Sequence, residues 1–523
     1  MIAIRQPENI VGYGFVFLIA FAFFFVLQYH DTLSDPDSFY HAKMALLMKE
    51  QGVITQFPWL GEFTVLGEAY IDQHFLYHVL LIPFVSALHP IIGLKIATTL
   101  FASLFVVTFY WLLRRLHMRW AAWLSLLLLL MNPLVFRLSL AKAPSLSLIV
   151  LLIGSYFIVK QRWKPLVILS FIYVWLYGGF AVIILSSGLY FLIDIVVSTY
   201  RRIFNSQSGG VNLLKVLTTN KSWKSLVATI VGVILGIVVN PYFPQNLFYY
   251  RYQLFEIGIK NYRDIIGVGG EWYPYVPIEL VGATVLLTLA FIGALVLFLI
   301  KSKRNLKRNI FFLALAAFFL LLTFKSRRYV EYYIPMACLF SFTIYGSLFW
   351  QLKPGYYWKR LVYFKSRKKI MVALVVLYFL ITVPTIIVQR YIQERNSMVN
   401  SIPHTKFLEV SQWLSSHSDK GDIVFHSSWD EFPMLFYHND TNYYIGGLDQ
   451  TFMYLYNKDL HKKWVDITTG KQSENLYEII SGDFKARYVL ASQKHTAMKR
   501  NIKSVSELEK VYEDSEAVVY EVH

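Results

Sequence analysis

Two aspartates placed two residues apart are the first residues of the chain whose types and spacing suggest chemistry. Asp35 and Asp37 follow the first long apolar run, within the segment 35–41. Two carboxylates in an extended turn can face one divalent cation or one hydroxyl group, and a nearby apolar surface raises a carboxyl pKa towards that of an effective base. A structural role competes with this one, because Ser34 or Asp35 could cap a helix that begins near Pro36. The two roles are compatible, and the sequence leaves both open.

Five basic residues beside apolar runs form a second group: Arg137, Lys142, Lys325, Arg327 and Arg328. Arg327 and Arg328 are adjacent, and guanidinium groups bind phosphate through paired donors, so we expect this pair to hold an anion. Lys142 and Lys325 also have a simpler explanation, because a lysine stem can lie along an apolar surface while its ammonium group stays in water.

A pair of histidines has the spacing of a possible metal site. His74 and His78 are four residues apart, and this spacing places both rings on one face of a helix, where they could bind zinc. The zinc-protease motif also needs a glutamate beside the first histidine, and Phe75 stands there. The sequence therefore does not favour a zinc site at this histidine pair.

The composition identifies the kind of molecule that positions these groups. Of the 523 residues, 56% are hydrophobic and only 16% are charged, whereas an average soluble chain has about 25% charged residues. The single cysteine, Cys338, excludes an internal disulfide. A net charge of +17 would suggest nucleic acid in a soluble protein, but here the basic residues lie between apolar runs. We therefore predict an integral membrane protein without a nucleic-acid partner.

Apolar runs of about 17–25 residues, the length that crosses a bilayer, recur over most of the chain. We predict about eleven to thirteen spanning helices, with candidates at 11–29, 94–113, 119–136, 143–159, 165–178, 179–198, 225–241, 277–300, 309–324, 329–350 and 370–389. The segment 75–90 is predicted as an interfacial helix. With the N-terminus in the cytoplasm, every basic cluster then lies on the cytoplasmic side, at 114–119, 160–164, 201–224, 301–308 and 353–369.

This topology places four segments outside: 30–93, 137–142, 242–276 and the tail. The sequence predicts a transmembrane domain over 1–395 and an extracytoplasmic α/β domain over 396–523. Within the latter it favours strands at 422–426 and 486–491 and helices at 407–415 and 504–511. Trp59, Trp272 and Tyr273 fit either an interfacial aromatic belt or a sugar-stacking surface.

The acidic segment after the first helix resembles the first outer loop of GT-C glycosyltransferases, which take sugars from polyprenyl-linked donors. It is nearest to that of the oligosaccharyltransferase catalytic subunits, whose loop reads Asp-Pro-aromatic-aromatic-Asn-Tyr-Arg. Asp35-Pro36 and the aromatic pair Phe39-Tyr40 fit, and His41 stands where that family has arginine. The resemblance implies that Asp35 is the catalytic carboxylate, as a base or a metal ligand.

Three further segments extend the resemblance. Residues 269–272 are similar to an outer-loop motif with a functional glutamate, here Glu271, and residues 327–333 to a late helix that contacts the donor phosphate. Trp429-Asp430 resembles the end of an acceptor-binding Trp-Trp-Asp motif, with Ser428 replacing the first tryptophan. The segment 137–144 departs from the family, because it contains Arg137 and Lys142 where a second acidic pair is expected.

Together these observations predict a glycosyltransferase of the outer membrane face, in what we expect to be a prokaryotic cell membrane. Asp35, Asp37 and Glu271 would be catalytic, Arg137, Lys142, Arg327 and Arg328 would hold a polyprenyl (di)phosphate, and Tyr40, His41, His74 and Trp272 would line the cavity. The acceptor would be a glycan, a lipid or a protein. The alternative is an oligosaccharyltransferase with Mg²⁺ or Mn²⁺ on Asp35, Asp37 and Glu271 and an acceptor protein near Trp429-Asp430. A transporter or flippase is disfavoured, because the spans hold almost no ionisable residues.

Overall fold

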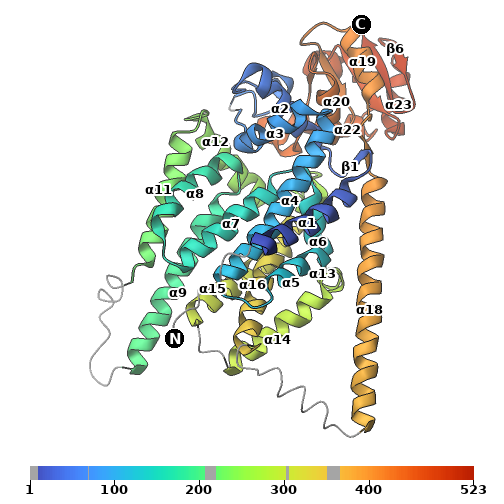
Figure 1. Cartoon of the computed structure of the whole chain (residues 1–523). Coiled ribbons are helices and arrows are strands. Elements are labelled where there is room, and N and C mark those ends of the chain that lie inside the picture. Colours follow the sequence, from blue (N-terminus) through green and yellow to red (C-terminus); the bar gives the residue numbers. More distant parts are fainter. Residues whose placement is uncertain (1–9, 69, 206–219, 302–304, 350–365) are drawn as a thin grey trace.

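The computed structural model describes residues 10–68, 70–205, 220–301, 305–349 and 366–523. Figure 1 shows a bundle of helices, with the C-terminal sheet at the same end as helices α2 (Asp37–Gln51) and α3 (Phe75–Ala87). The basic clusters predicted at 201–224, 301–308 and 353–369 lie partly outside the described residues. The chain is thus a polytopic helical protein with a small α/β region in its C-terminal part.

The bundle consists of apolar helices of different lengths. Among the described residues, four helices are long and apolar enough to cross a membrane: α1 (Ile10–Gln28), α4 (Pro90–Arg115), α9 (Ala181–Asn205) and α15 (Leu306–Thr323). Shorter apolar helices stand beside them, namely α3, α7 (Pro144–Val159), α8 (Trp163–Leu176) and α11 (Ser222–Val238). The helices α16 (Val330–Phe349) and α18 (Ser366–Val399) complete this part, with α18 at the right of Figure 1. The predicted break between 165–178 and 179–198 is confirmed, because α8 ends at Leu176 and α9 begins at Ala181.

Two predicted spans, at 119–136 and 277–300, are each divided into helices that meet at a sharp bend. In the first, α5 (Ala121–Leu126) and η2 (Leu127–Leu130) meet α6 (Asn132–Ser139) at 82°. The bend lies just before Pro133, which has no backbone N–H and so cannot donate the hydrogen bond that would continue the preceding helix. In the second, α13 (Pro277–Ala283) and α14 (Val285–Lys301) meet at 96°. Hydropathy reports burial in lipid but not the direction of the chain.

The C-terminal region contains a five-stranded sheet in the order β4-β3-β5-β7-β6. Its strands are β3 (Ile423–His426), β4 (Tyr443–Tyr444), β5 (Tyr488–Ser492), β6 (Leu508–Glu513) and β7 (Ala517–Val522). Strand β3 is parallel to β4 and β5, and β7 is antiparallel to β5 and β6. The helices around it are α19 (Leu408–His417), α20 (Phe432–His438), α21 (Gln450–Tyr456), α22 (Lys458–Thr468) and α23 (Thr496–Lys503).

The strands predicted around 422–426 and 486–491 and the helix at 407–415 are confirmed within one to three residues by β3, β5 and α19. The helix predicted at 504–511 is wrong, because strand β6 begins at Leu508. The antiparallel ladder with the largely buried strand β7 decides the conformation there, and a pairing partner outside the segment overrides its local preference.

The loop after α1 is attached to the C-terminal region by a strand pair and by several further contacts. A short strand, β1 (Thr32–Leu33), pairs with β2 (Ile402–Pro403) just beyond the end of α18. Farther along, Trp59 donates a hydrogen bond to the carbonyl oxygen of Asp440 (2.8 Å), and Lys43 on α2 forms an ion pair with the Asp440 carboxylate (3.1 Å). The aspartates between these two contacts are therefore held on a supported loop.

Candidate functional site

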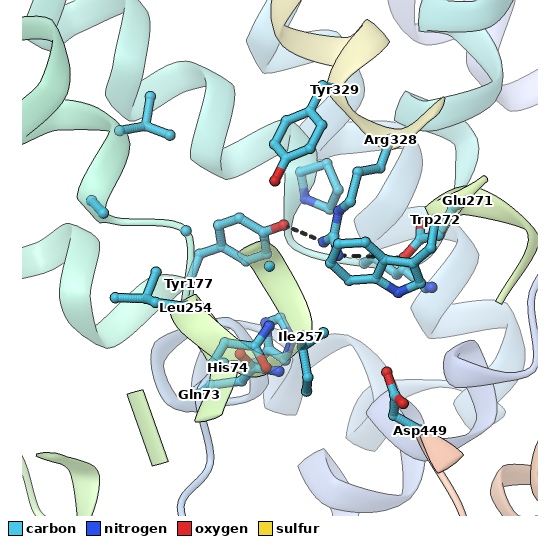
Figure 2. Close-up of a pocket in the computed structure, with 18 of the residues that line it drawn as sticks. Gln73, His74, Tyr177, Leu254, Ile257, Glu271, Trp272, Arg328, Tyr329 and Asp449 are labelled. Atoms are coloured by element: carbon cyan, nitrogen blue, oxygen red, sulfur yellow. Dashed lines mark hydrogen bonds and ion pairs between the residues drawn. The ribbon is translucent and has the colours of Figure 1, made fainter. Parts of the chain in front are cut away.

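A cavity of about 550 Å³ lies where the loops that connect the membrane helices meet the ends of these helices. Its walls come from α2, the segment before α3, the α6–α7 connection and the α8–α9 break. The remaining walls come from α15 and from three short helices, η3 (Tyr252–Lys260), η4 (Gly270–Trp272) and η5 (Arg327–Tyr329). Residues from 448–452 of the C-terminal region also line the cavity. Figure 2 shows the charged and aromatic side chains that face it.

One side of the cavity contains two carboxylates that share a lysine. The Nζ atom of Lys142 lies 2.9 Å from Asp35 Oδ2 and 2.8 Å from Asp37 Oδ2. The other Asp35 oxygen accepts the backbone N–H of Asp37 (2.9 Å), so Asp35 also supports the first turn of α2. Of these two carboxylates, the structure places Asp37 in the cavity lining. Burial raises the pKa of the Asp37 carboxyl to about 6, although Lys142 opposes this rise.

A second, neighbouring cluster contains two arginines and two glutamates, of which Arg137, Glu271 and Arg328 line the cavity. Arg137 lies at the end of α6, and its guanidinium binds Glu331 through Nε (2.7 Å) and Glu271 through Nη1. Arg328 adds a longer contact to Glu271 (3.7 Å). Burial alone would raise the pKa of the Glu271 carboxyl, but Arg328 and Arg137 outweigh it and hold that pKa well below its usual range. Arg137 and Lys142, predicted to bind phosphate, are thus both engaged by carboxylates of this chain.

Arg328 presents its guanidinium to the cavity in a fixed orientation. Its carbon Cζ lies 4.3 Å from the centroid of the Trp272 ring, and Nη2 donates a hydrogen bond to the Tyr177 hydroxyl (2.8 Å; Figure 2). The neighbouring Arg327 points elsewhere. Its guanidinium contacts the carbonyl oxygen of Pro274 and the Glu279 carboxylate, and its side chain is 47% exposed. The structure therefore separates the predicted arginine pair and leaves Arg328 as the member in the cavity.

Histidines stand beside these charged clusters. His41 Nδ1 lies 2.7 Å from His78 Nε2, and His78 Nδ1 lies 2.6 Å from Asp72 Oδ2. In the tautomers in which His78 donates to Asp72 and accepts from His41, the Nε2 atom of His41 is left as an acceptor. Burial lowers the pKa of His41 well below its ordinary value. His74 also lines the cavity, and among the described residues its buried Nδ1 has no hydrogen-bond partner.

An apolar wall continues from the charged part of the cavity towards the outside of the bundle. It contains Leu185 on α9, Phe255 and Ile259 on η3, and Phe319 and Leu322 on α15. Three of these side chains are partly open, because Leu185 is 38% exposed, Phe255 55% and Ile259 58%. A flexible apolar chain could lie along this wall while its polar end reaches the charged residues.

The C-terminal region reaches the cavity through Asp449, which the sequence analysis missed. Its carboxylate accepts the backbone N–H of Thr451 (2.8 Å), and burial raises the pKa of this carboxyl. The preceding residue, Leu448, has a φ of 63°, an unusual conformation for leucine that often accompanies functional sites. The predicted acceptor pair behaves differently: Asp430 accepts a hydrogen bond from the Ser428 hydroxyl, and Trp429 packs against the apolar core of the sheet region.

The carboxylates expected to bind Mg²⁺ or Mn²⁺ do not form a common donor set. Asp35 and Asp37 converge on the Lys142 ammonium group, and Glu271 converges on Arg137 and Arg328. Within the part of the chain that the structure describes, no three His, Cys, Asp or Glu side chains meet as a metal-binding group. Magnesium needs about six oxygen ligands in octahedral geometry, so the arrangement of these donors does not fit the ion.

Comparison with known proteins identifies the architecture. No family model and no curated protein matches the chain in sequence. Among solved structures, it is similar to the oligosaccharyltransferase of Archaeoglobus fulgidus, with a TM-score of 0.61, 12% identity and coverage of 93% of this chain and 71% of that one. ArnT from Cupriavidus metallidurans gives a TM-score of 0.53 with 14% identity and covers 98% of both chains.

A third similar structure is the mycobacterial arabinofuranosyltransferase AftD, with a TM-score of 0.55 and 10% identity. It covers 98% of this chain, which in turn spans 40% of that one. All three are membrane glycosyltransferases with the GT-C architecture. The predicted GT-C fold is therefore confirmed, and the chain is an integral membrane protein with a fold close to that of the oligosaccharyltransferases.

Proposed function

We propose that this protein is a glycosyltransferase that moves a sugar from a polyprenyl (di)phosphate donor to an acceptor hydroxyl or amide at the outer membrane face. The observation that supports it best is the continuity of one cavity, which joins a carboxylate, a stacked arginine and an apolar wall. The stacked arginine suits the phosphate of a lipid-linked sugar, and the apolar wall suits its hydrocarbon chain. One solved oligosaccharyltransferase structure with this architecture contains dolichol phosphate and an inhibitory peptide.

In the proposed reaction, an acceptor oxygen or nitrogen attacks the anomeric carbon, and the bond between that carbon and the phosphate oxygen breaks. Asp37 takes the acceptor proton, because it lines the cavity and its raised pKa makes it a more effective base. His41 lies one helical turn after Asp37, on the same face of α2. It can accept a hydrogen bond from the incoming acceptor through Nε2.

Arg328 stabilises the negative charge that develops on the departing phosphate oxygen. Its ring contact with Trp272 and its bond to Tyr177 fix the guanidinium before the donor arrives, so little ordering is needed on binding. Lys325, which also lines the cavity, supplies a second positive charge on this side. The apolar wall of α9, η3 and α15 receives the polyprenyl chain.

The adjacent arginines allow a matched test with purified protein in detergent. A long-chain polyprenyl phosphate and the corresponding alcohol serve as probes, and binding is measured by titration. The wild type should bind the phosphate far better than the alcohol. Arg328→Gln should weaken phosphate binding by about 10–100-fold, as expected for a lost charge-assisted hydrogen bond. Arg327→Gln, in which the altered side chain lies outside the cavity, should bind like the wild type.

Transfer is then measured with a panel of polyprenyl-phosphate and polyprenyl-diphosphate sugars in vesicles that contain candidate glycan, lipid and peptide acceptors. Release of the polyprenyl (di)phosphate together with labelled product supports the proposal. The acceptor that becomes labelled decides between a protein and the other acceptor classes. Equal binding of alcohol and phosphate, or equal losses in the two arginine variants, would refute the assignment of Arg328.

A further inference from the structure

The contact between Lys142 and the two aspartates has a consequence for how this centre works. Each aspartate gives one oxygen to the same ammonium group, at 2.9 Å and 2.8 Å. These are lengths of charge-assisted hydrogen bonds. The three side chains are only 13–31% exposed, so the ammonium group fills the space between the carboxylates.

The backbone around Lys142 holds it in this place. Lys142 lies three residues after the end of α6, and its N–H donates to the carbonyl oxygen of Leu140 (2.8 Å). Two residues later, Pro144 begins α7, which restricts the conformation of the connection. The lysine therefore extends from a short connection between two packed helices, and its predicted role at the membrane surface does not match this position.

A divalent cation would need the same oxygens that the ammonium group occupies. It would also need further ligands, and Glu271, the expected third carboxylate, is bound by Arg137 and Arg328. A metal ion beside the ammonium group would in addition face like-charge repulsion at close range. The two cations are thus alternatives at one position.

We propose that the Lys142 ammonium group is a built-in cation that takes the place of a divalent metal between Asp35 and Asp37. It is a positioning residue: it keeps both carboxylates close together and joins the outer loop to the α6–α7 connection. The centre then carries out its reaction without a bound metal ion. The inference that the reaction needs no metal ion rests on the proposed function. The inference that Lys142 fills the position between Asp35 and Asp37 does not depend on that function.

The occupancy is tested by Mn²⁺ binding, which needs no sugar donor. Purified full-length protein in detergent is titrated with Mn²⁺, and free Mn²⁺ is measured by electron paramagnetic resonance. The wild type should bind no Mn²⁺ at this position. Lys142→Asn, which removes the ammonium group and leaves an amide oxygen, should bind one Mn²⁺ per chain, and Asp37→Asn in that background should abolish the gain.

Lys43→Asn is the matched control, because Lys43 is also an outer-loop lysine but pairs with the single carboxylate of Asp440. It should bind no Mn²⁺. Thermal unfolding of each variant with and without Mn²⁺ shows whether the chain is folded, and Mn²⁺ should raise the unfolding temperature of Lys142→Asn alone. If this variant does not fold, the wild type still provides the test.

Two results would overturn the proposal. In the first, the wild-type protein binds one Mn²⁺, and Asp35→Asn or Asp37→Asn abolishes this binding. In the second, Lys142→Asn is folded and binds no Mn²⁺. For wild-type protein that transfers sugar, EDTA should leave the rate unchanged. Absence of any transfer together with the expected Mn²⁺ pattern would refute the proposed function and leave the built-in cation intact.

Discussion

The two charged clusters of the cavity use different cations for different purposes. On one side, a single ammonium group joins Asp35 and Asp37, which leaves one negative charge in excess. On the other side, Arg137 and Arg328 balance Glu271 and Glu331. An ammonium group is a compact charge with rotatable donors, whereas a guanidinium group binds carboxylates in a fixed planar geometry.

The most deeply buried ion pair and the most exposed carboxylate belong to different clusters. Glu331 is fully buried and Arg137 is 6% exposed, whereas Asp37 is 31% exposed, and Glu271 in the arginine cluster is 25% exposed. The balanced arginine cluster is therefore suited to hold η4, η5 and α6 together, and the aspartate cluster is suited to meet a substrate. Four predictions test this division, in order of decreasing effect.

Asp37→Asn should have the largest effect on transfer. The change removes the base from the cavity, so we expect a loss of about 10²–10⁴-fold in rate, the usual range for general base catalysis. Asp35→Asn keeps an oxygen for the Asp37 N–H and should lose less than about tenfold. Initial transfer rates of both variants at saturating donor check this order. Equal losses would place both carboxylates in the same role.

Arg137→Met should affect stability more than any change in the aspartate cluster. It leaves Glu331 buried without its partner, and breaking a buried ion pair costs about 3–5 kcal/mol. Thermal or denaturant unfolding in detergent should show this loss for Arg137→Met and a smaller one for Asp35→Asn. The double change of Arg137→Met with Glu331→Gln should recover part of the stability, because no buried charge is then left alone. A double variant less stable than Arg137→Met would contradict this account.

The pH dependence of transfer should reflect Asp37. Its pKa is raised to about 6, and only the ionised form accepts a proton, so the rate should fall as pH drops through about 6. Lys142 opposes the rise of this pKa, so Lys142→Gln should move the acidic limb to higher pH. Rates measured between about pH 5 and pH 8 test both statements. A limb that stays in place in Lys142→Gln would show that another group controls it.

Ser326→Ala should have the smallest effect. The Ser326 hydroxyl donates to the carbonyl oxygen of Glu271 (2.8 Å) and helps to hold η5 against η4. Loss of one such hydrogen bond should cost about 1 kcal/mol of stability. Unfolding measurements check this value. A loss of stability as large as that of Arg137→Met would mean that the contact of Ser326 with the Glu271 carbonyl, and not the arginine cluster, holds η4 and η5 together.

The sequence was sufficient to predict the class of fold and much of the cavity lining. Apolar runs marked the helices, and Gly178-Gly179 marked the α8–α9 break. Nine of the predicted site residues line the cavity, including Asp37, His74 and Arg328. These predictions succeeded because lipid burial and loop position are local properties of the chain.

The sequence could not show which charged side chains form ion pairs with one another in the folded chain. Arg137 lies 194 positions from Glu331 and 134 from Glu271, and no local pattern indicates that these residues meet. Both Arg137 and Lys142 were therefore assigned to a phosphate, although carboxylates of the same chain occupy them. Asp449 was missed for the same reason, since only tertiary folding brings 448–452 to the membrane helices.

The short pairing of β1 with β2 places the start of the C-terminal region close to the loop that carries Asp35 and Asp37. Thr32 faces Pro403 across this ladder, and Asp35 follows three residues after Thr32. The same region sends Asp449 into the cavity. A lifting of the sheet region would therefore pull on the aspartate loop and withdraw one wall of the cavity in a single motion. Movement of the C-terminal sheet region would therefore change the shape of the cavity between the membrane helices.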